Sequence, residues 1–387
     1  MAKFKTIMGR LVLMVLPVVV FIIVALGFFA RKTDPLSYVQ HPMEGHPLKA
    51  QYDADKADFP KNLAYYEYWL YAFPPYTSAT INITGFYSAR LAPASAPTET
   101  ATCRVWMFGG STLADMETAD ALTISSQLAA ALRERGVEAE VLNFGVPGYA
   151  SSVELLKFQD ILRRCAESRQ PDVVVFYDGY NDPYLGWVGG AGNLQPDLSA
   201  KLEMVVTRQT ARYLLLRLSD ALGDRFALWR NTIGHRLTAR AAQHEKNIDQ
   251  VVHIYLANVR MARAVAQEFG IRPFFVLQPL LMTKQPLSAR EQEIYNEGGR
   301  ALKSFVLDFY GRVRAGLAEE EDFLDFSGVL NNRAATDFYD ECHTGPYTGE
   351  VIGRALAERL AGPLEHKVAR KRMLTSPEPA ESREPAE

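Results

Sequence analysis

The feature that most constrains the fold is a regular alternation of short apolar runs and helical patterns, which begins near Cys103. The clearest run is Asp172 to Tyr177, DVVVFY, whose consecutive β-branched and aromatic residues are typical of a strand buried on both faces. Strands that are separated by helices form parallel sheets, because each helix returns the chain to the same end of the sheet. We therefore expect an α/β fold with a central parallel sheet covered by helices on both faces.

The same pattern predicts the boundaries of the folded domain. The expected strands are 104–108, 138–143, 172–177, 272–277 and 323–326, and the expected helices are 119–135, 152–164, 248–269, 289–315 and 346–360. Residues 193–247 interrupt the alternation with Arg-rich and Leu-rich helical sequence, which indicates an insertion. After Leu364 the chain is rich in Lys and Arg, and then in Pro, Glu and Ser. We expect the domain over residues 103–364 and a disordered tail over 365–387.

The N-terminus contains an uncharged apolar stretch from Leu11 to Ala30. Its length is about that of one helix crossing a bilayer, and basic residues flank it on both sides with a small excess before it. A cleaved signal peptide is the alternative, because Ala25 and Gly27 have the small side chains of a cleavage site. The apolar stretch is longer than in most signal peptides, so residues 1–32 are predicted to be a membrane anchor. Residue 33 onward then faces an extracytoplasmic space such as the bacterial periplasm.

Residues 33–102 are rich in Pro, Tyr and Asp and show no sustained period. The stretch from Phe59 to Tyr76 is dense in aromatic residues, which suits either a carbohydrate-stacking surface or an arm that packs on the domain. The packing arm is favoured, because Tyr and Trp bury large areas while keeping one polar end in contact with water. The segment from Ala92 to Thr102 reads as a polar, Pro-containing linker.

Charge and cysteine content exclude several classes of function. The chain has 387 residues and a formal net charge of -3, with no basic run outside the termini, so nucleic-acid binding is not expected. The three cysteines, Cys103, Cys165 and Cys342, are far apart and lack the spacing of metal ligands. We expect neither a metal site nor a cofactor.

Three short motifs follow the first three predicted strands. Ser111 follows Gly109-Gly110, Gly145 lies in a Gly/Pro turn, and Asn181 lies in Gly-Tyr-Asn-Asp. Each motif alone is typical of an ordinary turn. Because the carboxyl ends of parallel strands meet at one edge of a sheet, the three motifs are expected to lie together. They would supply a hydroxyl and two donors for a developing oxyanion.

The fourth motif is Asp340-Glu-Cys-His343, near the start of the last predicted helix. Its three-residue spacing can bring the carboxylate of Asp340 to the imidazole N–H of His343, which fixes the tautomer and stabilises the imidazolium. The alternative is a surface histidine near a helix start, with the aspartate as a capping group. Cys342 is expected to be a buried neighbour, because Ser111 already supplies a nucleophile.

Together the four motifs resemble the blocks of the SGNH (GDSL-like) hydrolase superfamily, over residues 103 to 360. The resemblance implies a flavodoxin-like three-layer α/β/α sandwich and a catalytic triad of Ser111, His343 and Asp340. It also implies an oxyanion hole made by the backbone N–H groups of Ser111 and Gly145 and by the side chain of Asn181. The chain departs from the family at Gly110, where members usually carry Asp, and this departure puts assignment to the lipolytic branch in doubt.

The function implied by the resemblance is that of a serine esterase or acyl-transfer enzyme. Family membership and an extracytoplasmic location point to O-acetyl groups on cell-surface carbohydrate, with an acylated small molecule as the simpler substrate. One alternative is a lipid or thioester hydrolase, for which the apolar stretch from Tyr213 to Leu218 could form a lid, although its spacing favours helical core packing. The other is a non-catalytic scaffold or polysaccharide-binding subunit with partners in an envelope assembly.

The implied fold also suggests a disulfide between Cys103 and Cys165 if the compartment is oxidising. Each cysteine lies shortly before a predicted strand, and the two strands are neighbours in such a fold.

Overall fold

The computed structural model describes residues 42–60, 63–66, 68–98, 100–189 and 247–375. They belong to one unit that combines His41–Leu194 with Lys246–Glu387. The predicted anchor over 1–32, the predicted insertion apart from Asn247, and residues 376–387 of the tail lie outside the described residues. No helix in the described part of the chain is long and apolar enough to cross a membrane.

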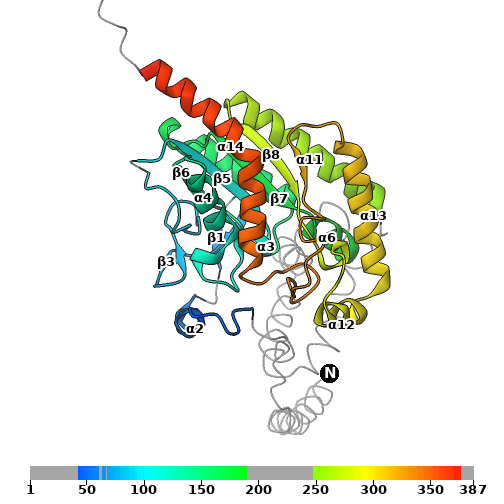
Figure 1. The fold of residues 1–387 in the computed structure, drawn as a ribbon. Helices are drawn as coiled ribbons and strands as arrows, with labels where there is room; N and C mark the ends of the chain where they lie inside the picture. The colour runs from blue at the N-terminus through cyan, green and yellow to red at the C-terminus, as the bar shows by residue number, and fades with distance from the viewer. Residues whose placement is uncertain (1–41, 61–62, 67, 99, 190–246, 376–387) are drawn as a thin grey trace, which may run out of the picture. The chain divides into compact units, whose positions relative to one another are not determined.

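A parallel sheet forms the centre of this unit (Figure 1). Its five strands are β5 (Cys103–Gly109), β6 (Ala139–Asn143), β7 (Val173–Asp178), β8 (Arg272–Leu277) and β9 (Phe323–Asp325). They are arranged in the order β6-β5-β7-β8-β9, and every neighbouring pair is parallel. This is the strand order of flavodoxin-like proteins, in which ligands bind at the carboxyl ends of the strands. The prediction of a central parallel sheet is confirmed.

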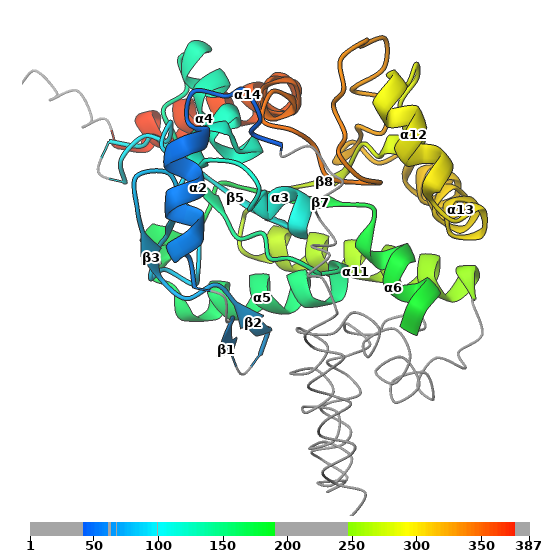
Figure 2. The same ribbon diagram turned by 90° about the horizontal axis from the view of Figure 1, so that it is seen from below.

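Helices cover both faces of the sheet, as predicted. They are α4 (Ile124–Glu134), α5 (Ser151–Arg164), α11 (Ile248–Glu268), α12 (Ala289–Glu297), α13 (Arg300–Leu317) and α14 (Thr348–Thr375). Figure 2 shows α4 and α14 on one side of the strands and α5 and α11 on the other. Strand β5 serves both layers, because Val105 and Met107 pack with α4 and α14 while Trp106 and Phe108 pack with α5 and α11. Burying side chains of this size stabilises the fold by about 1.5–3 kcal/mol each.

Two glycines let α14 approach α4 closely. A Cβ placed on Gly353 would come within 2.7 Å of the backbone nitrogen of Leu128, and one on Gly349 would come within 2.3 Å of the carbonyl oxygen of Leu122. The spacing of four residues puts both glycines on one face of α14. Since α14 follows directly after the loop that carries His343, this packing holds the loop at the carboxyl edge of the sheet.

Three helices differ from their predicted extent. The helix predicted over 119–135 begins only at Ile124, after a separate 3-10 helix over Asp120–Leu122. The predicted helix 289–315 is broken into α12 and α13 at Gly298 and Gly299, because glycine is a poor helix former. The last helix, α14, was predicted to end at residue 360, but it continues to Thr375 and takes in the first part of the tail that was predicted to be disordered. Residues 365–375 are mostly Glu, Lys, Ala, Arg, Met and Leu, which favour helix despite the charge.

The N-terminal part of the unit packs on the domain. It contains helix α2 (Lys49–Asp58) and the short strands β1 (Ala64–Tyr66), β2 (Leu70–Ala72), β3 (Tyr76–Thr77) and β4 (Asn82–Ile83). The side chain of Trp69 is 2% exposed, and its indole N–H donates to Asp160 of α5. Tyr149 donates its hydroxyl proton to the Trp69 carbonyl, whereas Tyr65 stays exposed. Most of this aromatic stretch therefore makes packing contacts.

The predicted linker runs beside strand β6. The N–H of Ala96 donates to the Ala139 carbonyl, and the hydroxyl of Ser95 accepts from the N–H of Val141. Residues 92–102 therefore cover the outer edge of the sheet, where an uncovered strand would expose unpaired backbone groups.

The predicted disulfide between Cys103 and Cys165 is wrong, because both cysteines are thiols. Cys103 lies in the apolar layer with α4 and α14, whereas Cys165 packs against the opposite layer, with α5 and α11. The sheet separates them, although the strands that follow them are neighbours.

Candidate active site

Ser111 stands at the end of β5, in the turn that the sequence predicted. Gly109 makes a close contact that excludes a side chain, since a Cβ there would lie 2.8 Å from the carbonyl oxygen of Tyr177. Gly110 is extended, and Ser111 opens the short helix α3 (Ser111–Ala114). The first N–H of a helix has no intrahelical acceptor, so the N–H of Ser111 is available to a bound oxyanion.

A buried arginine from the N-terminal part supports this turn. The Arg90 guanidinium donates to the carbonyl oxygens of Ala114, Asp115 and Thr118 at 2.5–2.6 Å. It also pairs with Asp120 at 2.7 Å, and both side chains are 2% exposed. The carbonyls that end α3 are thereby satisfied, and Arg90 fixes the C-terminal end of the short helix that Ser111 opens.

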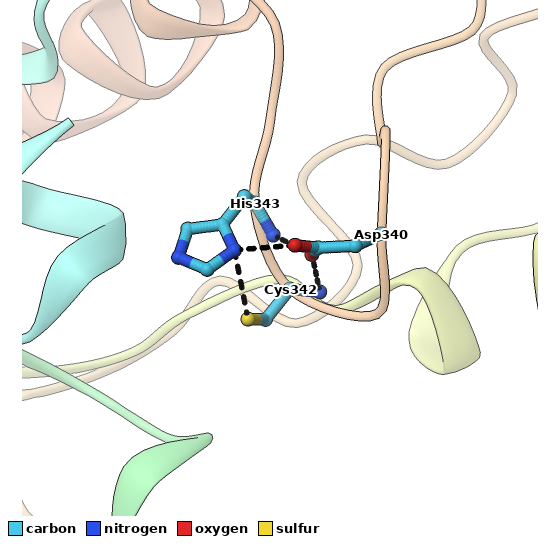
Figure 3. Close-up of side chains that lie close together, drawn as sticks. All are labelled: Asp340, Cys342 and His343. Atoms are coloured by element: carbon cyan, nitrogen blue, oxygen red, sulfur yellow. Dashed lines mark hydrogen bonds and ion pairs between the residues drawn. The ribbon is translucent and has the colours of Figure 1, made fainter. Parts of the chain in front are cut away.

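Ser111, His343 and Asp340 form a continuous hydrogen-bonded chain. The Nε2 atom of His343 lies 2.7 Å from Oγ of Ser111, and its Nδ1 atom lies 2.6 Å from Oδ2 of Asp340. Oδ1 of Asp340 accepts the backbone N–H groups of Cys342 and His343 at 2.8 and 2.7 Å. Figure 3 shows the carboxylate against the imidazole. The three-residue spacing thus gives a carboxylate that is fixed by its own turn.

The charges around His343 favour its protonated form. Burial acts to lower the pKa of His343, but the hydrogen bond and charge of Asp340, with smaller effects from Asp115 and Glu117, outweigh burial and raise it above 6.5. Burial likewise acts to raise the pKa of Asp340, and its hydrogen bonds with His343 and Cys342 outweigh burial and lower it. Asp340 therefore stays ionised and keeps a proton on Nδ1 of the imidazole. In neutral His343 the lone pair of Nε2 then faces Ser111.

Cys342 is a neighbour of the imidazole. Its Sγ atom lies 3.5 Å from Nδ1 of His343, and burial, together with the charges of Asp340 and Glu341, raises the pKa of the thiol. A thiol held in its protonated form is a poor nucleophile. Asp340, Cys342 and His343 are also ligand types for a metal ion, with their ligand atoms within 4.8 Å of one another. While His343 keeps its two hydrogen bonds, neither ring nitrogen can bind a metal.

Asn181 opens helix α6 (Asn181–Gly189) after β7, and its amide lies against the turn that carries Ser111. Its Nδ2 atom donates to the carbonyl oxygen of Tyr149 at 2.6 Å. A Cβ placed on Gly110, the residue before Ser111, would come within 2.1 Å of Nδ2. The amide therefore reaches the turn that carries Ser111, and its second hydrogen has no acceptor among the described residues.

The backbone N–H groups of the loop after β6 differ in their hydrogen bonding. The N–H of Gly145 donates to Oδ1 of Asn143 at 2.9 Å, so this predicted oxyanion donor is already used. Gly148 has a φ of 79° and directly precedes Tyr149, whose carbonyl binds Asn181. Within the described residues the N–H of Gly148 has no acceptor. Its N–H is therefore free to bind an oxyanion, whereas that of Gly145 is not.

Three acidic residues lie near the Asn181 turn, of which Glu154 and Asp178 are buried and Asp182 is partly buried. Asp182 accepts the N–H and hydroxyl of Ser151 at 3.1 and 2.6 Å and so joins the start of α6 to that of α5. Burial, followed by the charge of Asp178, raises the pKa of Glu154, and burial, followed by the charge of Asp182, raises the pKa of Asp178 to about 8. At neutral pH this favours a protonated carboxyl in the pair, which avoids two adjacent buried negative charges.

Neither a protein-family model nor a curated protein matches the sequence. Several solved structures match the chain in fold. One is a GDSL-like lipase from Bacteroides thetaiotaomicron, at 12% identity over 72% of this chain and 92% of that chain, with a TM-score of 0.33. Another is a catalytic mutant of an acetylxylan esterase from Geobacillus stearothermophilus, at 12% identity over 68% and 94% of the two chains, with a TM-score of 0.37. The chain is similar to GDSL-like hydrolases.

Sequence reasoning missed three contributors to this site. Arg90 lies in the aromatic-rich segment, where nothing marked it as a partner for the nucleophile turn. Gly148 stands in the same Gly/Pro turn as Gly145, and only the backbone geometry separates the two. Gln278 directly follows β8, and its side chain accepts a hydrogen bond from Thr112, the residue after Ser111. Its position at the end of a predicted strand was the one available signal.

Proposed function

We propose that this protein is a serine esterase or acyl-transfer enzyme with Ser111 as nucleophile, His343 as general base and Asp340 as its orienting carboxylate. The observation that carries the proposal is the unbroken chain of hydrogen bonds, at 2.7 and 2.6 Å, from the serine hydroxyl through the imidazole to the carboxylate. Hydrogen bonds of this length are those expected between a nucleophile, its base and the group that orients the base.

The first half of the proposed reaction forms an acyl-enzyme. Nε2 of His343 takes the Ser111 proton as Oγ attacks the ester carbonyl carbon. The carbonyl oxygen becomes an oxyanion, which accepts from the Ser111 N–H, the Asn181 side chain and the N–H of Gly148. When the tetrahedral intermediate collapses, the bond to the leaving alcohol breaks and His343 gives the alcohol its proton. Each oxyanion donor contributes about 10²–10³ in rate.

The second half returns the enzyme to its starting state. His343 removes a proton from water, the resulting hydroxide attacks the acyl carbon, and the bond to Oγ of Ser111 breaks as Oγ regains the proton. A sugar hydroxyl in place of water would complete transfer of the acyl group. Both outcomes use the same residues, so the acceptor that reaches the acyl-enzyme decides between hydrolysis and transfer.

For the substrate, we propose O-acetylated carbohydrate of the cell surface. Two exposed aromatic side chains near the site support this. Tyr347, four residues after His343, is 65% exposed, and Tyr184, 37% exposed, stacks on Tyr180 with ring centroids 5.5 Å apart. The face of a sugar ring packs well on an aromatic side chain that keeps its hydroxyl in water. The membrane anchor over 1–32, an extracytoplasmic domain and envelope partners remain part of the same proposal.

The test compares the full-length protein with Ser111→Ala on p-nitrophenyl acetate and on an acetylated polysaccharide, with release of acetate as the readout. Ser168→Ala is the matched control, because Ser168 is exposed and remote from His343. We expect turnover by the wild type and by the control, loss in Ser111→Ala, and preference for the polymer. Equal turnover by Ser111→Ala would refute the enzyme proposal, and a non-catalytic scaffold would then be favoured.

A further inference from the structure

Gln278 is held rigidly at the carboxyl edge of the sheet. It directly follows β8 and is 2% exposed. Its N–H donates to the carbonyl oxygen of Asp178 at 2.7 Å, and its own carbonyl oxygen accepts from the hydroxyl of Tyr310 at 2.9 Å. The backbone of Gln278 is thus tied to the end of β7 and to helix α13, and its side chain has a fixed origin.

The side-chain amide of Gln278 is satisfied at one end only. Its Oε1 atom accepts the hydroxyl of Thr112 at 2.8 Å, and Thr112 is the residue after Ser111. Its Nε2 atom is buried and has no hydrogen-bond partner in the described residues. A buried donor without an acceptor costs about 1–3 kcal/mol, so such a group calls for a structural or functional explanation.

A small cavity lies between this amide and Asn181. Its volume is about 10 Å³, and Gln278, Gly110, Asn181 and Asp178 are among the residues that line it. A polar cavity of this volume has room for about one water molecule. Asn181 also has an unused polar atom, because its Nδ2 donates to Tyr149 while its Oδ1 receives no hydrogen bond from the residues that the structure describes.

We propose that Gln278 is a positioning residue for the oxyanion donor Asn181, acting through one buried water. In this arrangement Nε2 of Gln278 donates to the water, and the water donates to Oδ1 of Asn181. The Asn181 amide is then held at Oδ1 by the water and at Nδ2 by Tyr149, which fixes its plane. The second hydrogen of Nδ2 can point only toward the nucleophile turn. The inference rests on the proposed esterase function.

The network also joins the nucleophile to its oxyanion donor. Thr112 follows Ser111 and fixes the orientation of the Gln278 amide, so that its NH₂ group faces the cavity. A shift of the nucleophile turn therefore changes the water site that orients Asn181. Water-mediated contacts of this kind are nearly as favourable as direct hydrogen bonds.

The test uses Gln278→Met, which keeps the approximate length of the side chain and removes both polar ends. We expect kcat for p-nitrophenyl acetate to fall about tenfold with KM unchanged, less than the 10²–10³ for loss of a whole oxyanion donor. Thr112→Val is expected to lower kcat similarly, and the double variant to lower it no further, because both act on one network. Gln292→Met, at an exposed glutamine of α12, is the matched control and should retain wild-type kcat.

The outcomes separate this inference from the proposed function. If wild-type turnover depends on Ser111 but kcat is unchanged in Gln278→Met, the role of Gln278 is overturned and the proposed function stands. Absence of Ser111-dependent turnover in the wild type overturns both. If Gln278→Met does not fold, a high-resolution crystal structure of the wild type decides. A water within hydrogen-bond distance of both Nε2 of Gln278 and Oδ1 of Asn181 supports the inference, and a cavity without such a water overturns it.

Discussion

The Nδ2 atom of Asn181 occupies the space that a side chain at Gly110 would need, since a Cβ there would lie 2.1 Å away. In this chain, any side chain at position 110 would therefore require the Asn181 amide to move. With Gly110, the amide of Asn181 can lie directly on the turn that presents Ser111. The absence of a side chain at Gly110 thus brings together Ser111 and Asn181, the proposed nucleophile and the proposed oxyanion donor.

Gly110→Ala should therefore lower activity. The new methyl group must displace the Asn181 amide, and loss of one oxyanion donor lowers kcat by about 10²–10³-fold. Steady-state hydrolysis of p-nitrophenyl acetate measures the effect. Gly311→Ala is the control, because a Cβ at this glycine of α13 meets no atom within 4 Å. Equal loss of kcat in the two variants would contradict the account.

Asp340→Asn should change both the rate and its pH dependence. His343 must be neutral to accept the Ser111 proton, so activity should rise with pH through a midpoint above 6.5, the ordinary value that its pKa exceeds here. Asn removes the charge that raises this pKa and leaves burial, which lowers it, so the midpoint should move down. The rate should fall about 10⁴-fold, as for loss of the carboxylate in other Ser-His-Asp triads.

A pH–rate profile of kcat/KM for both proteins measures this shift. Glu319→Gln serves as the control, since it removes a carboxylate at the opposite edge of the sheet. An unchanged midpoint in Asp340→Asn would mean that Asp340 does not control the protonation of His343.

The oxyanion donors can be identified in a crystal structure of the protein with a phosphonate bonded to Oγ of Ser111. We expect the phosphoryl oxygen to accept from Asn181 and from the N–H of Gly148, because the N–H of Gly145 already donates to Asn143 at 2.9 Å. A phosphoryl oxygen bound to the N–H of Gly145 instead would show that the loop rearranges on binding and would restore the donor predicted from the sequence.

Arg90→Met should destabilise the fold. It leaves Asp120 buried without its partner and three carbonyl oxygens without their donor. Breaking a buried ion pair by removing one partner costs about 3–5 kcal/mol of unfolding free energy. Urea unfolding measures the change, with Arg133→Met as the control, because the Arg133 pair with Glu138 is half exposed and should matter little. If Arg90→Met lost as little unfolding free energy as Arg133→Met, the supporting role of Arg90 would be refuted.

Much of the fold could be predicted because its signals are local. The run DVVVFY has the residue types of a buried central strand, and it is strand β7. The break between α12 and α13 was missed, since two adjacent glycines weaken a helix without forbidding it. The Cys103–Cys165 pairing failed for a different reason. Neighbouring strands bring two chain segments together, but the face on which each cysteine lies depends on tertiary packing.

The same contrast between local signals and tertiary packing applies to the candidate site. The contact between Asp340 and His343 follows from a spacing within one turn, and the sequence predicts it. The choice between Gly145 and Gly148 depends on the direction of one N–H group, which a Gly/Pro motif does not encode. Arg90 and Gln278 act through partners that are 30 and 166 residues away in the chain, so no local pattern could indicate them.

The most direct test of the central claim is covalent labelling of the full-length protein with a fluorophosphonate, followed by mass spectrometry of the labelled peptide. The account predicts one adduct on Ser111, its absence in Ser111→Ala, and much slower labelling in His343→Ala, because the hydroxyl then lacks its base. An intact protein without an adduct, or one that carries its adduct on a different residue, would contradict the assignment of Ser111 as the nucleophile.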